Sequence, residues 1–446
     1  MRTTRRSFLK SATLAAAAMS SGLGVRAAEA RKPNIVLIMA DDIGYECYGA
    51  YGSKTYSTPN IDKLAQSGAL FTHAYSQPLC TPSRVQLMTG KHNFRNYIRF
   101  GKFDEKEPNF ATMLRDAGYR TSVAGKWQLT PGKLDGPHQA GFDEYLLWHF
   151  QELSGDDFGP EFEDKGSRYK SPQLYRDGKR VPDTEGKYGP DLVCDYVTEF
   201  IERNREQPFF VYYPMILVHN PFDPTPDSKA WADGGDDKAH FPDMVAYMDK
   251  CIGRVFDKLD ALGLRENTLI IVTGDNGTNP DIESPLPGRG MVRGGKGKTT
   301  DAGTHVCFVA NWKGVIAPGT VLDTPIDFTD VLPTLASASG ATAPPGIDGQ
   351  NLLPLLKGET KEARGWAFMS YSRNGASQAP YVCSVRDQRW KLYADGRLYD
   401  VPNDYLEKTP ASGPDADAAR ARLQPILDNV LKGATNVARD VKAATG

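Results

Sequence analysis

The sequence predicts an α/β fold in which helices cover both faces of a mostly parallel central sheet. Short apolar runs rich in β-branched and aromatic residues alternate with longer segments of helical periodicity, and polar clusters follow several of these runs directly. This alternation favours a parallel sheet because each crossover helix packs on one of the sheet's faces. The chain has 446 residues, enough for one large domain and a smaller appendage.

Several segments have the length and composition of strands, and the segments between them have helical periodicity. Strands are expected at residues 34–40 (NIVLIMA), 120–124 (RTSVA), 208–213 (PFFVYY), 268–273 (TLIIVT) and 305–312 (HVCFVANW). Helices are expected at residues 108–117, 191–205 and 241–262. The polar, turn-rich segment 156–187 predicts an insertion or long loop.

The pattern changes at the polar segment 358–363 (GETKEA), beyond which the expected strands are shorter. They fall at residues 366–371, 381–386, 390–393 and 397–399, with a hairpin-turn signal at Asp395-Gly396 and a helical tail over 415–443. We therefore predict a main domain over residues 31–360 and a C-terminal α+β subdomain with an antiparallel sheet over residues 361–446.

Residues 1–30 have the pattern of a signal peptide: a basic start, an Ala-rich apolar run and Ala28-Glu29-Ala30 as the cleavage site. Arg5-Arg6 followed by Ser-Phe-Leu-Lys matches the twin-arginine export signal, a route that carries folded proteins. The sequence therefore predicts a periplasmic or extracellular protein that is not integral to the membrane.

Removing residues 1–30 takes away five positive charges and one negative charge, so the formal net charge changes from −2 to −6. A mildly acidic protein is a poor ligand for nucleic acid or anionic membranes, so any bound anion needs a local basic site. The six cysteines are widely and irregularly spaced without a Cys-x-x-Cys pair. This spacing predicts neither a disulfide framework nor a zinc site.

Polar side chains follow the predicted strands at the points where the strands end. Asp41-Asp42 follows the first strand, Lys126 and His219 follow the next two, and Asp275-Asn276 follows the fourth. Ligands of open α/β sheets bind beyond the carboxyl ends of the strands, so these residues predict one shared site. Adjacent carboxylates favour a hard cation such as Ca²⁺ or Mg²⁺, although either acidic pair alone also suits an ordinary turn.

A glycine-rich basic loop, RGMVRGGKGK, spans residues 289–298. A nucleotide-binding P-loop is excluded because Gly297 stands where Ser or Thr must reach the metal. The loop suits binding of an anion through Lys296, and the alternative is a solvated flexible loop.

The run CTPSRVQLMTG at residues 80–90 places a thiol at the start of a predicted helix. Pro82 suits the first turn, and the helix N-terminus offers free N–H groups to an anion. Arg84, one turn along, can bind an oxyanion. The alternative is a small buried Cys before an ordinary helix.

This run resembles the signature of the type I, arylsulfatase-like sulfatases, Cys-x-Pro-Ser-Arg-x-x-Leu-x-Thr-Gly, with every fixed position filled. The resemblance extends from Asp41-Asp42 through Asp275-Asn276-Gly277 to Asp348-Gly349 and Leu398-Tyr399-Asp400. It implies an alkaline-phosphatase-like fold and a sulfuric ester hydrolase. It also implies that a separate formylglycine-generating enzyme oxidises Cys80 to formylglycine before export, and that a hydroxyl of the hydrated aldehyde attacks sulfur.

The resemblance also implies a role for each matching residue. Arg84 would hold the hydrated aldehyde, Lys126 and Lys296 would bind sulfate oxygens, and His219 would help to protonate the leaving alcohol. The residues matching the family's metal ligands, usually around Ca²⁺ and less often Mg²⁺, are Asp41, Asp42, Asp275 and Asn276.

Two positions depart from the family pattern. Gln128 stands where the family usually has the His that accepts a proton when sulfate is expelled, and an amide is not a base at neutral pH. The sequence-local candidates to replace that base are His92 and Lys126. Residues 300–305 also differ from the family's Tyr-Glu-Gly-Gly-x-Arg, which leaves open how Lys296 is supported.

The expected substrate is a small or oligomeric sulfate ester, most plausibly a sulfated carbohydrate. The alternatives are a phosphate or phosphonate ester hydrolase on the same fold and a sulfated-glycan-binding pseudoenzyme. Trp148, His149, Phe150 and segment 156–187 either line the substrate pocket or serve only in packing.

Overall fold

A mixed ten-stranded sheet forms the centre of the computed structural model, which describes residues 31–148, 168–375 and 380–439. Its strands β1, β8, β4, β5 and β9 run parallel, whereas β13 runs antiparallel to β9 and β2. The order across the sheet is β14 (Thr320–Leu322), β2 (Ala69–Phe71), β13 (Phe308–Asn311), β9 (Thr268–Gly274), β1 (Asn34–Ala40), β8 (Phe209–Pro214), β4 (Arg120–Lys126), β5 (Glu144–Trp148), β6 (Tyr175–Arg176) and β7 (Lys179–Arg180). The predicted α/β class is confirmed.

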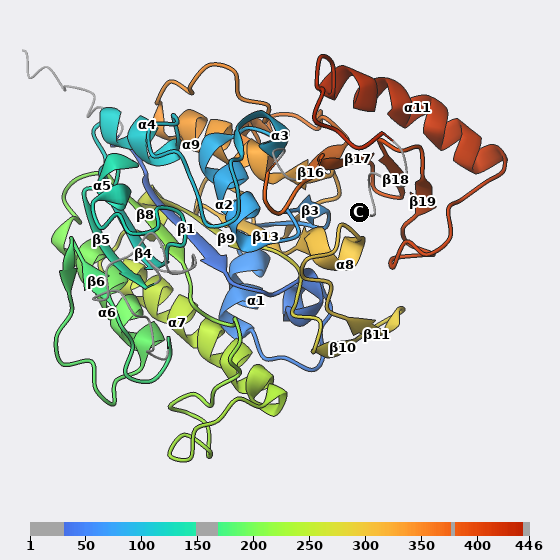
Figure 1. Cartoon of the computed structure of the whole chain (residues 1–446). Helices are drawn as coiled ribbons and strands as arrows, with labels where there is room; N and C mark the ends of the chain where they lie inside the picture. The colour runs from blue at the N-terminus through green and yellow to red at the C-terminus, as the bar shows by residue number, and fades with distance from the viewer. Residues whose placement is uncertain (1–30, 149–167, 376–379, 440–446) are drawn as a thin grey trace, which may run out of the picture. The chain divides into compact units, whose positions relative to one another are not determined.

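Alternate residues of β1 face two separate cores. Ile35, Leu37 and Met39 pack with α2 (Cys80–Thr89), α4 (Phe110–Asp116) and α9 (Val331–Ser339). Val36 and Ile38 pack with α1 (Pro59–Gln66), α6 (Gly189–Arg203) and α7 (Phe241–Ala261). Figure 1 shows α2, α4 and α9 on one side of the sheet and α6 and α7 on the other. Burial on both faces explains why the strand is a continuous apolar run.

The predicted strand over residues 305–312 is divided in the structure. Residues His305–Val306 form β12, which pairs with β3 (Ala74–Tyr75) in a small sheet completed by β15 (Ile326–Asp327), and the main sheet resumes with β13. At the break, the carbonyl of Cys307 accepts a hydrogen bond from the Thr273 hydroxyl at 2.7 Å. The apolar pattern predicted one unbroken strand here, but at the break the carbonyl of Cys307 bonds to a side chain and not to a backbone N–H of β9.

The described part of the predicted loop 156–187 contains more structure than expected. Residues 175–180 form the β6–β7 hairpin, and β6 extends the edge of the sheet by pairing with β5. Residues 149–167 lie outside the described part, as do the predicted signal peptide and the candidate pocket residues His149 and Phe150.

The C-terminal sequence forms the predicted antiparallel sheet. Its order is β16 (Ala367–Tyr371), β17 (Val382–Arg386), β18 (Trp390–Tyr393) and β19 (Leu398–Asp400). The helix predicted over 415–443 is shorter: α11 spans Pro414–Val430. The chain then pairs with Tyr381, which donates to the Asn436 carbonyl at 2.7 Å, so tertiary pairing replaces helix there.

The remaining helices and the remaining hairpin are short. They are α3 (Asn93–Asn96), α5 (Gly136–Gln139), α8 (Asp301–Thr304), α10 (Leu353–Leu356), β10 (Glu283–Leu286) and β11 (Gly290–Arg293). Among the described helices, none combines the length and apolar composition needed to cross a membrane. All six cysteines are buried and free.

Candidate active site

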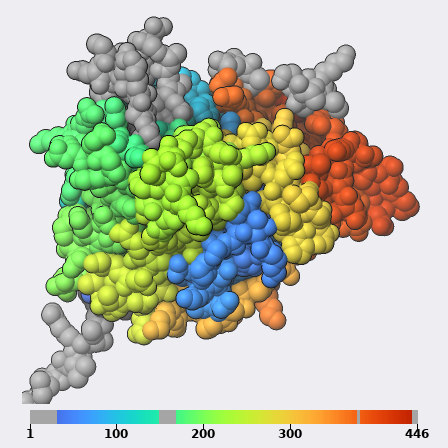
Figure 2. Space-filling model, turned by 90° about the horizontal axis from the view of Figure 1, so that it is seen from below, coloured from blue at the N-terminus to red at the C-terminus, as the bar shows by residue number. Residues whose placement is uncertain are grey.

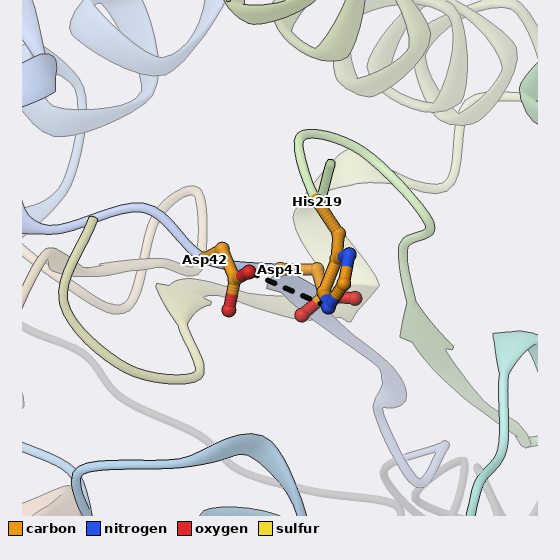
Figure 3. Close-up of side chains that lie close together, drawn as sticks. All are labelled: Asp41, Asp42 and His219. Atoms are coloured by element: carbon orange, nitrogen blue, oxygen red, sulfur yellow. Dashed lines mark ion pairs between the residues drawn. The ribbon is translucent and has the colours of Figure 1, made fainter. Parts of the chain in front are cut away.

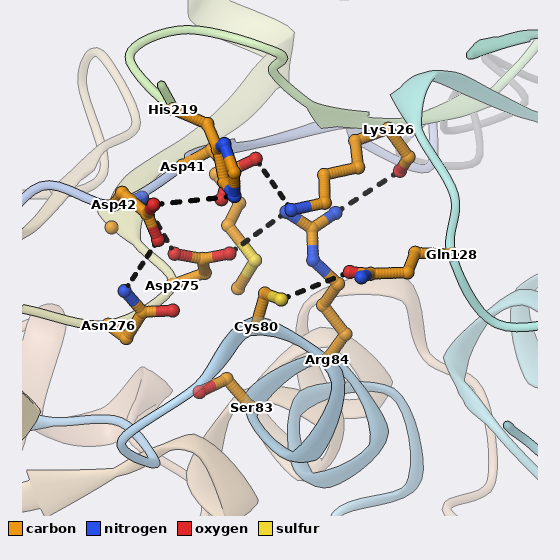
Figure 4. A network of polar contacts seen from close by, with 12 residues as sticks. Asp41, Asp42, Cys80, Ser83, Arg84, Lys126, Gln128, His219, Asp275 and Asn276 are labelled. Carbon is orange, nitrogen blue, oxygen red and sulfur yellow. Dashed lines mark hydrogen bonds and ion pairs between the residues drawn. The ribbon is translucent and has the colours of Figure 1, made fainter. Parts of the chain in front are cut away.

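The carboxyl ends of the parallel strands bring the predicted site residues together (Figure 4). Asp41 and Asp42 follow β1, Lys126 ends β4, and Asp275 follows β9. Cys80 is the first residue of α2, whose N-terminus lies at the same edge. Residues that are up to 254 positions apart in sequence therefore contact one another directly.

Three acidic or amide side chains and one backbone N–H form a linked group at this edge. The backbone N–H of Asp42 donates to Asp275 Oδ1 at 3.0 Å, and Asn276 Nδ2 donates to Asp42 Oδ1 at 2.9 Å. Asp42 adopts a left-handed φ of 57°, a conformation that Asp tolerates better than most residues. The strand ends are close-packed, since a Cβ on Gly274 would lie 2.4 Å from the Ile43 carbonyl oxygen.

This group has the oxygen atoms that a hard cation requires. Oδ1 of Asp41 and Oδ1 of Asn276 are buried and have no hydrogen-bond partner among the described residues, whereas Asp41 Oδ2 pairs with Lys126. Buried oxygens without donors are costly unless another positive group compensates them. Potential ligand atoms of Asp41, Asp42 and His219 lie within 4.8 Å of one another. Figure 3 shows these three side chains close together. The donor set therefore fits a divalent metal ion, and His219 joins the candidates that sequence analysis had limited to Asp and Asn.

Each of the three buried carboxylates is paired with its own cation. Lys126 Nζ lies 2.9 Å from Asp41 Oδ2, and Lys296 Nζ lies 2.5 Å from Asp42 Oδ2. The third pair joins Arg84 Nη2 and Asp275 Oδ2 at 3.0 Å, with both side chains fully buried. Buried charges need such pairing.

The electrostatics differ among the three carboxyl groups. Burial alone raises the pKa of Asp41, but the charges of Lys126 and His219 outweigh it and hold that pKa far below its ordinary value. The pKa of Asp275 is raised to about 7, first because the group is buried and then because Asp41 is negative.

Cys80 is held as a neutral thiol. Its Sγ donates to Gln128 Oε1 at 3.0 Å, and burial is the main reason that its pKa is raised, although the charge of Lys126 opposes the shift. A thiolate at neutral pH would need the opposite shift. The unmodified side chain is therefore not an activated nucleophile.

The other residues of the Cys80 run fix the position of α2. The Ser83 hydroxyl accepts from the Gln77 N–H at 3.0 Å and donates to the Gln77 carbonyl at 3.1 Å, which holds the chain entering the helix. Arg84 also donates to the Lys126 carbonyl at 3.1 Å. Gly90 ends the helix at a φ of 66°, which suits glycine.

His219 contacts both the acidic group and Lys296. Its Nε2 is 3.5 Å from Asp42 Oδ2 and 3.1 Å from Lys296 Nζ. Burial lowers the pKa of His219 to about 4 despite the nearby Asp42, so the ring is neutral at pH 7. Because the Lys296 ammonium can only donate, Nε2 accepts when these two groups are hydrogen-bonded.

Arg168 is a site residue that sequence analysis missed. Its Nη1 lies 2.6 Å from His219 Nδ1, and its guanidinium lies 4.3 Å from the centre of the Trp148 ring. The Asn220 carbonyl lies 2.6 Å from the same nitrogen, so the tautomer of His219 decides which neighbour it bonds. Arg168 falls in the predicted loop, where its only sequence signal is its charge.

His92 does not lie at the site. It follows the C-terminal end of α2, whose ten residues span ~15 Å from Cys80. Its backbone N–H donates to Asp348 at 2.8 Å, and its ring packs against Phe368 at 4.5 Å between centroids. The suggestion that His92 replaces the family's base is therefore wrong on distance.

A cleft of about 750 Å³ adjoins the site. Asn220, the neighbour of His219, lies in its wall, together with Tyr56, Phe222, Lys238, Glu283 and Arg293. Figure 2 shows the blue, yellow-green and yellow segments that contribute these residues side by side on one face.

The mixed sheet, its flanking helices and the site at its strand ends define an α/β protein with the alkaline-phosphatase-like fold. A model of the Sulfatase family matches residues 33–341. Arylsulfatase A of Homo sapiens is 33% identical over 417 residues, which cover 84% of this chain and 76% of that protein. The chain therefore belongs to the sulfatase family and is a sulfuric ester hydrolase.

Two solved structures are similar to this chain in fold. Ps i-CgsB in complex with k-i-k-neocarrahexaose superposes with a TM-score of 0.73 at 25% identity, covering 92% of this chain and 94% of that chain. The phosphonate monoester hydrolase of Agrobacterium radiobacter gives a TM-score of 0.66 at 23% identity, covering 90% and 95%. The second likeness shows the shared fold alone.

Proposed function

We propose that this sulfatase hydrolyses a sulfate ester of a carbohydrate, with Cys80 converted to formylglycine and a divalent cation, Ca²⁺ in the first place, held by Asp41, Asp42, Asp275 and Asn276. The observation that carries the proposal is the setting of Cys80. Its neutral thiol is buried beside Lys126 and the acidic group, where a thiol has no evident task of its own. As the precursor of an oxygen nucleophile, the same side chain is correctly placed.

Formylglycine and a divalent cation would supply chemistry that the side chains lack. Hydrated formylglycine at position 80 would supply a hydroxyl group to attack sulfur, and a divalent cation held by the acidic group would supply the charge that favours its ionised form. Asp41 and Asn276 support the cation site because the buried Oδ1 atom of each has no hydrogen-bond partner among the described residues.

The protein's own cations stabilise the negative charge of the transferring sulfate. Lys126 pairs with Asp41 and Lys296 pairs with Asp42, and both can turn a donor toward a sulfate oxygen. Arg84 is fixed by Asp275 and the Lys126 carbonyl, and in the proposed reaction it would hold the group at position 80. Fixed charges of this kind need no reorganisation during the reaction.

In this proposal His219 would help to transfer a proton to the leaving alcohol. It adjoins Lys296 on one side and the cleft-lining Asn220 on the other. The alcohol part of the ester would then extend into the cleft, whose polar and aromatic walls suit a sugar. The carbohydrate ligand of the Ps i-CgsB complex supports this substrate class.

We also propose export by the twin-arginine route, with formylglycine formed in the cytoplasm before translocation. The basic start of the chain and its Arg5-Arg6 pair support this order, because the route carries folded proteins. Mass spectrometry of the mature protein would show an N-terminus near residue 31. A mature chain that keeps residues 1–30 would contradict export by cleavage.

The test of the proposed function combines peptide mass spectrometry with activity. Peptides that contain Cys80 from active protein should carry an aldehyde in place of the thiol, and defined sulfated sugars should release inorganic sulfate. A parallel assay with phosphate and phosphonate esters distinguishes the alternative hydrolase. Full activity with an unmodified Cys80 would overturn the mechanism, and binding of sulfated glycans without turnover would favour a binding protein.

A further inference from the structure

The segment that follows Lys296, residues 297–304, is held by the C-terminal sheet. Lys391 and Tyr393 of β18 both donate to the Thr299 carbonyl, the Tyr393 bond being 3.2 Å long. Both side chains also contact Glu407: Lys391 Nζ lies 3.0 Å from Oε1, and the Tyr393 hydroxyl donates to Oε2 at 2.5 Å. The Lys391 and Glu407 side chains are only 1% and 2% exposed, so water scarcely competes for these bonds.

A second attachment holds Asp301, the first residue of α8. Its backbone N–H donates to Glu407 Oε1 at 3.0 Å, and Arg386 of β17 donates to its Oδ1 at 2.6 Å. Burial alone raises the pKa of Asp301, but the neighbouring His305 and Arg386 outweigh it and hold that pKa well below its usual range. Glu407 thus joins both attachments, and Figure 1 shows α8 beside the C-terminal strands.

Close backbone contacts connect this attached segment to Lys296. A Cβ on Gly295 would lie 2.5 Å from the carbonyl carbon of Ala302, and one on Gly303 would lie 1.9 Å from the Lys298 carbonyl oxygen. The glycines therefore let two backbone stretches on either side of Lys296 touch without side chains between them. A displacement of residues 301–303 must be accompanied by a displacement of Lys296.

We propose that Arg386, Lys391 and Glu407 are positioning residues for Lys296. This inference rests on the proposed function, in which Lys296 binds the sulfate group. A lysine side chain has four rotatable bonds, so its contribution depends on a fixed backbone origin. The C-terminal sheet supplies that origin from outside the main sheet. Residues 300–305 depart from the family pattern, and their attachment to the C-terminal sheet explains how they can still support Lys296.

The experiment compares Lys391→Met and the milder Tyr393→Phe with the unchanged enzyme, using nitrophenyl sulfate as substrate and inorganic sulfate as the binding probe. Lys391→Met should lower kcat/KM ~10- to 100-fold, the effect expected of a small misplacement of a binding group. Sulfate binding should weaken in parallel. Hydrogen exchange of peptides covering 294–304 should accelerate, a readout that needs no catalytic activity. Tyr393→Phe should show the same changes at smaller size and keeps the inference testable if Lys391→Met does not fold.

The matched control is Arg364→Met. Arg364 is also buried and pairs with Asp327 and Asp330 at 2.8 Å and 3.0 Å, but it does not contact residues 297–304. It should lower thermal stability without accelerating exchange in 294–304. The inference is overturned if a folded Lys391 variant keeps the parent's sulfate affinity and exchange rates, or if Arg364→Met changes both equally. Wild-type turnover in Lys296→Ala would instead refute the role of Lys296 in the proposed function.

Discussion

The thiol of Cys80 donates a hydrogen bond to Gln128 Oε1 at 3.0 Å, so the residue at the family's usual His position contacts the side chain that we propose as the precursor of the nucleophile. Gln128 follows β4 with a left-handed φ of 55°, which turns its side chain toward α2. The departure from the family pattern thus lies beside the position from which, in the proposed mechanism, sulfate would be expelled.

We expect Gln128→His to raise steady-state turnover about 10-fold or more, since a general base contributes typically ~10²–10⁴-fold. The two substitutes suggested by the sequence are unsuitable: His92 is remote, and the charge of Asp41 outweighs burial to raise the pKa of Lys126, so that Lys126 stays protonated. Rapid mixing of the unchanged enzyme should therefore show a burst of desulfated product equal to the active sites.

A linear time course, with no gain in Gln128→His, would show that another group accepts the proton. The neutral ring of His219 would then be the first group to examine. Gln128→Asn is the control, because it keeps an amide but shortens it, and it should show no gain.

Cys80→Ala should fold and lose turnover by about 10³-fold or more, because it removes the only precursor of the proposed nucleophile. Its stability should change little, since the lost contact is one hydrogen bond worth about 1 kcal/mol and a small buried sulfur. Steady-state kinetics and the melting temperature separate the two effects. Retained turnover in Cys80→Ala would rule out any reaction through position 80.

Chelation should lower both turnover and melting temperature, and Ca²⁺ should restore them. A ligand bound only by the native state at 100 times its Kd stabilises it by about 2.7 kcal/mol. The measurement is a thermal melt together with metal analysis for the parent and for Asp41→Ala, a variant that removes the unpartnered buried Oδ1 atom. If Asp41→Ala and Asp275→Ala keep full metal content and turnover, the acidic group is not a metal site.

Asp330 should make stability depend on pH between about 4 and 7. Its pKa is raised to about 7, mainly by burial and then by Asp327, against the charge of Arg364. In this window the native state keeps a proton that the unfolded chain releases, so the free energy of unfolding falls as pH rises.

The prediction for Asp330 is checked by urea unfolding of the parent and Asp330→Asn at several pH values. Asp330→Asn has about the size of the protonated Asp330 side chain and does not titrate. Its free energy of unfolding should therefore fall less than that of the parent between pH 5 and about 7. The lowered pKa of Asp327 affects stability only at more acidic pH, as its carboxylate becomes protonated. Parallel profiles for parent and variant would contradict the assignment.

The sequence by itself determined the strand core and the chemistry at its edge. The apolar runs at 34–40 and 268–273 became β1 and β9, and the acidic residues after them met because parallel strands end at the same edge. The run at Cys80 likewise identified the family, since its residues are contiguous and each has a local role in forming or fixing α2.

Only the tertiary structure decided which distant side chains complete the site. The contacts of His219 with Arg168 and Lys296 join segments 51 and 77 residues apart, and the removal of His92 from the site follows from the direction of α2. The tertiary structure also brings Lys391 and Glu407 into contact with the segment that follows Lys296. Periodicity reports which face a residue occupies, but the packing of elements determines which faces meet.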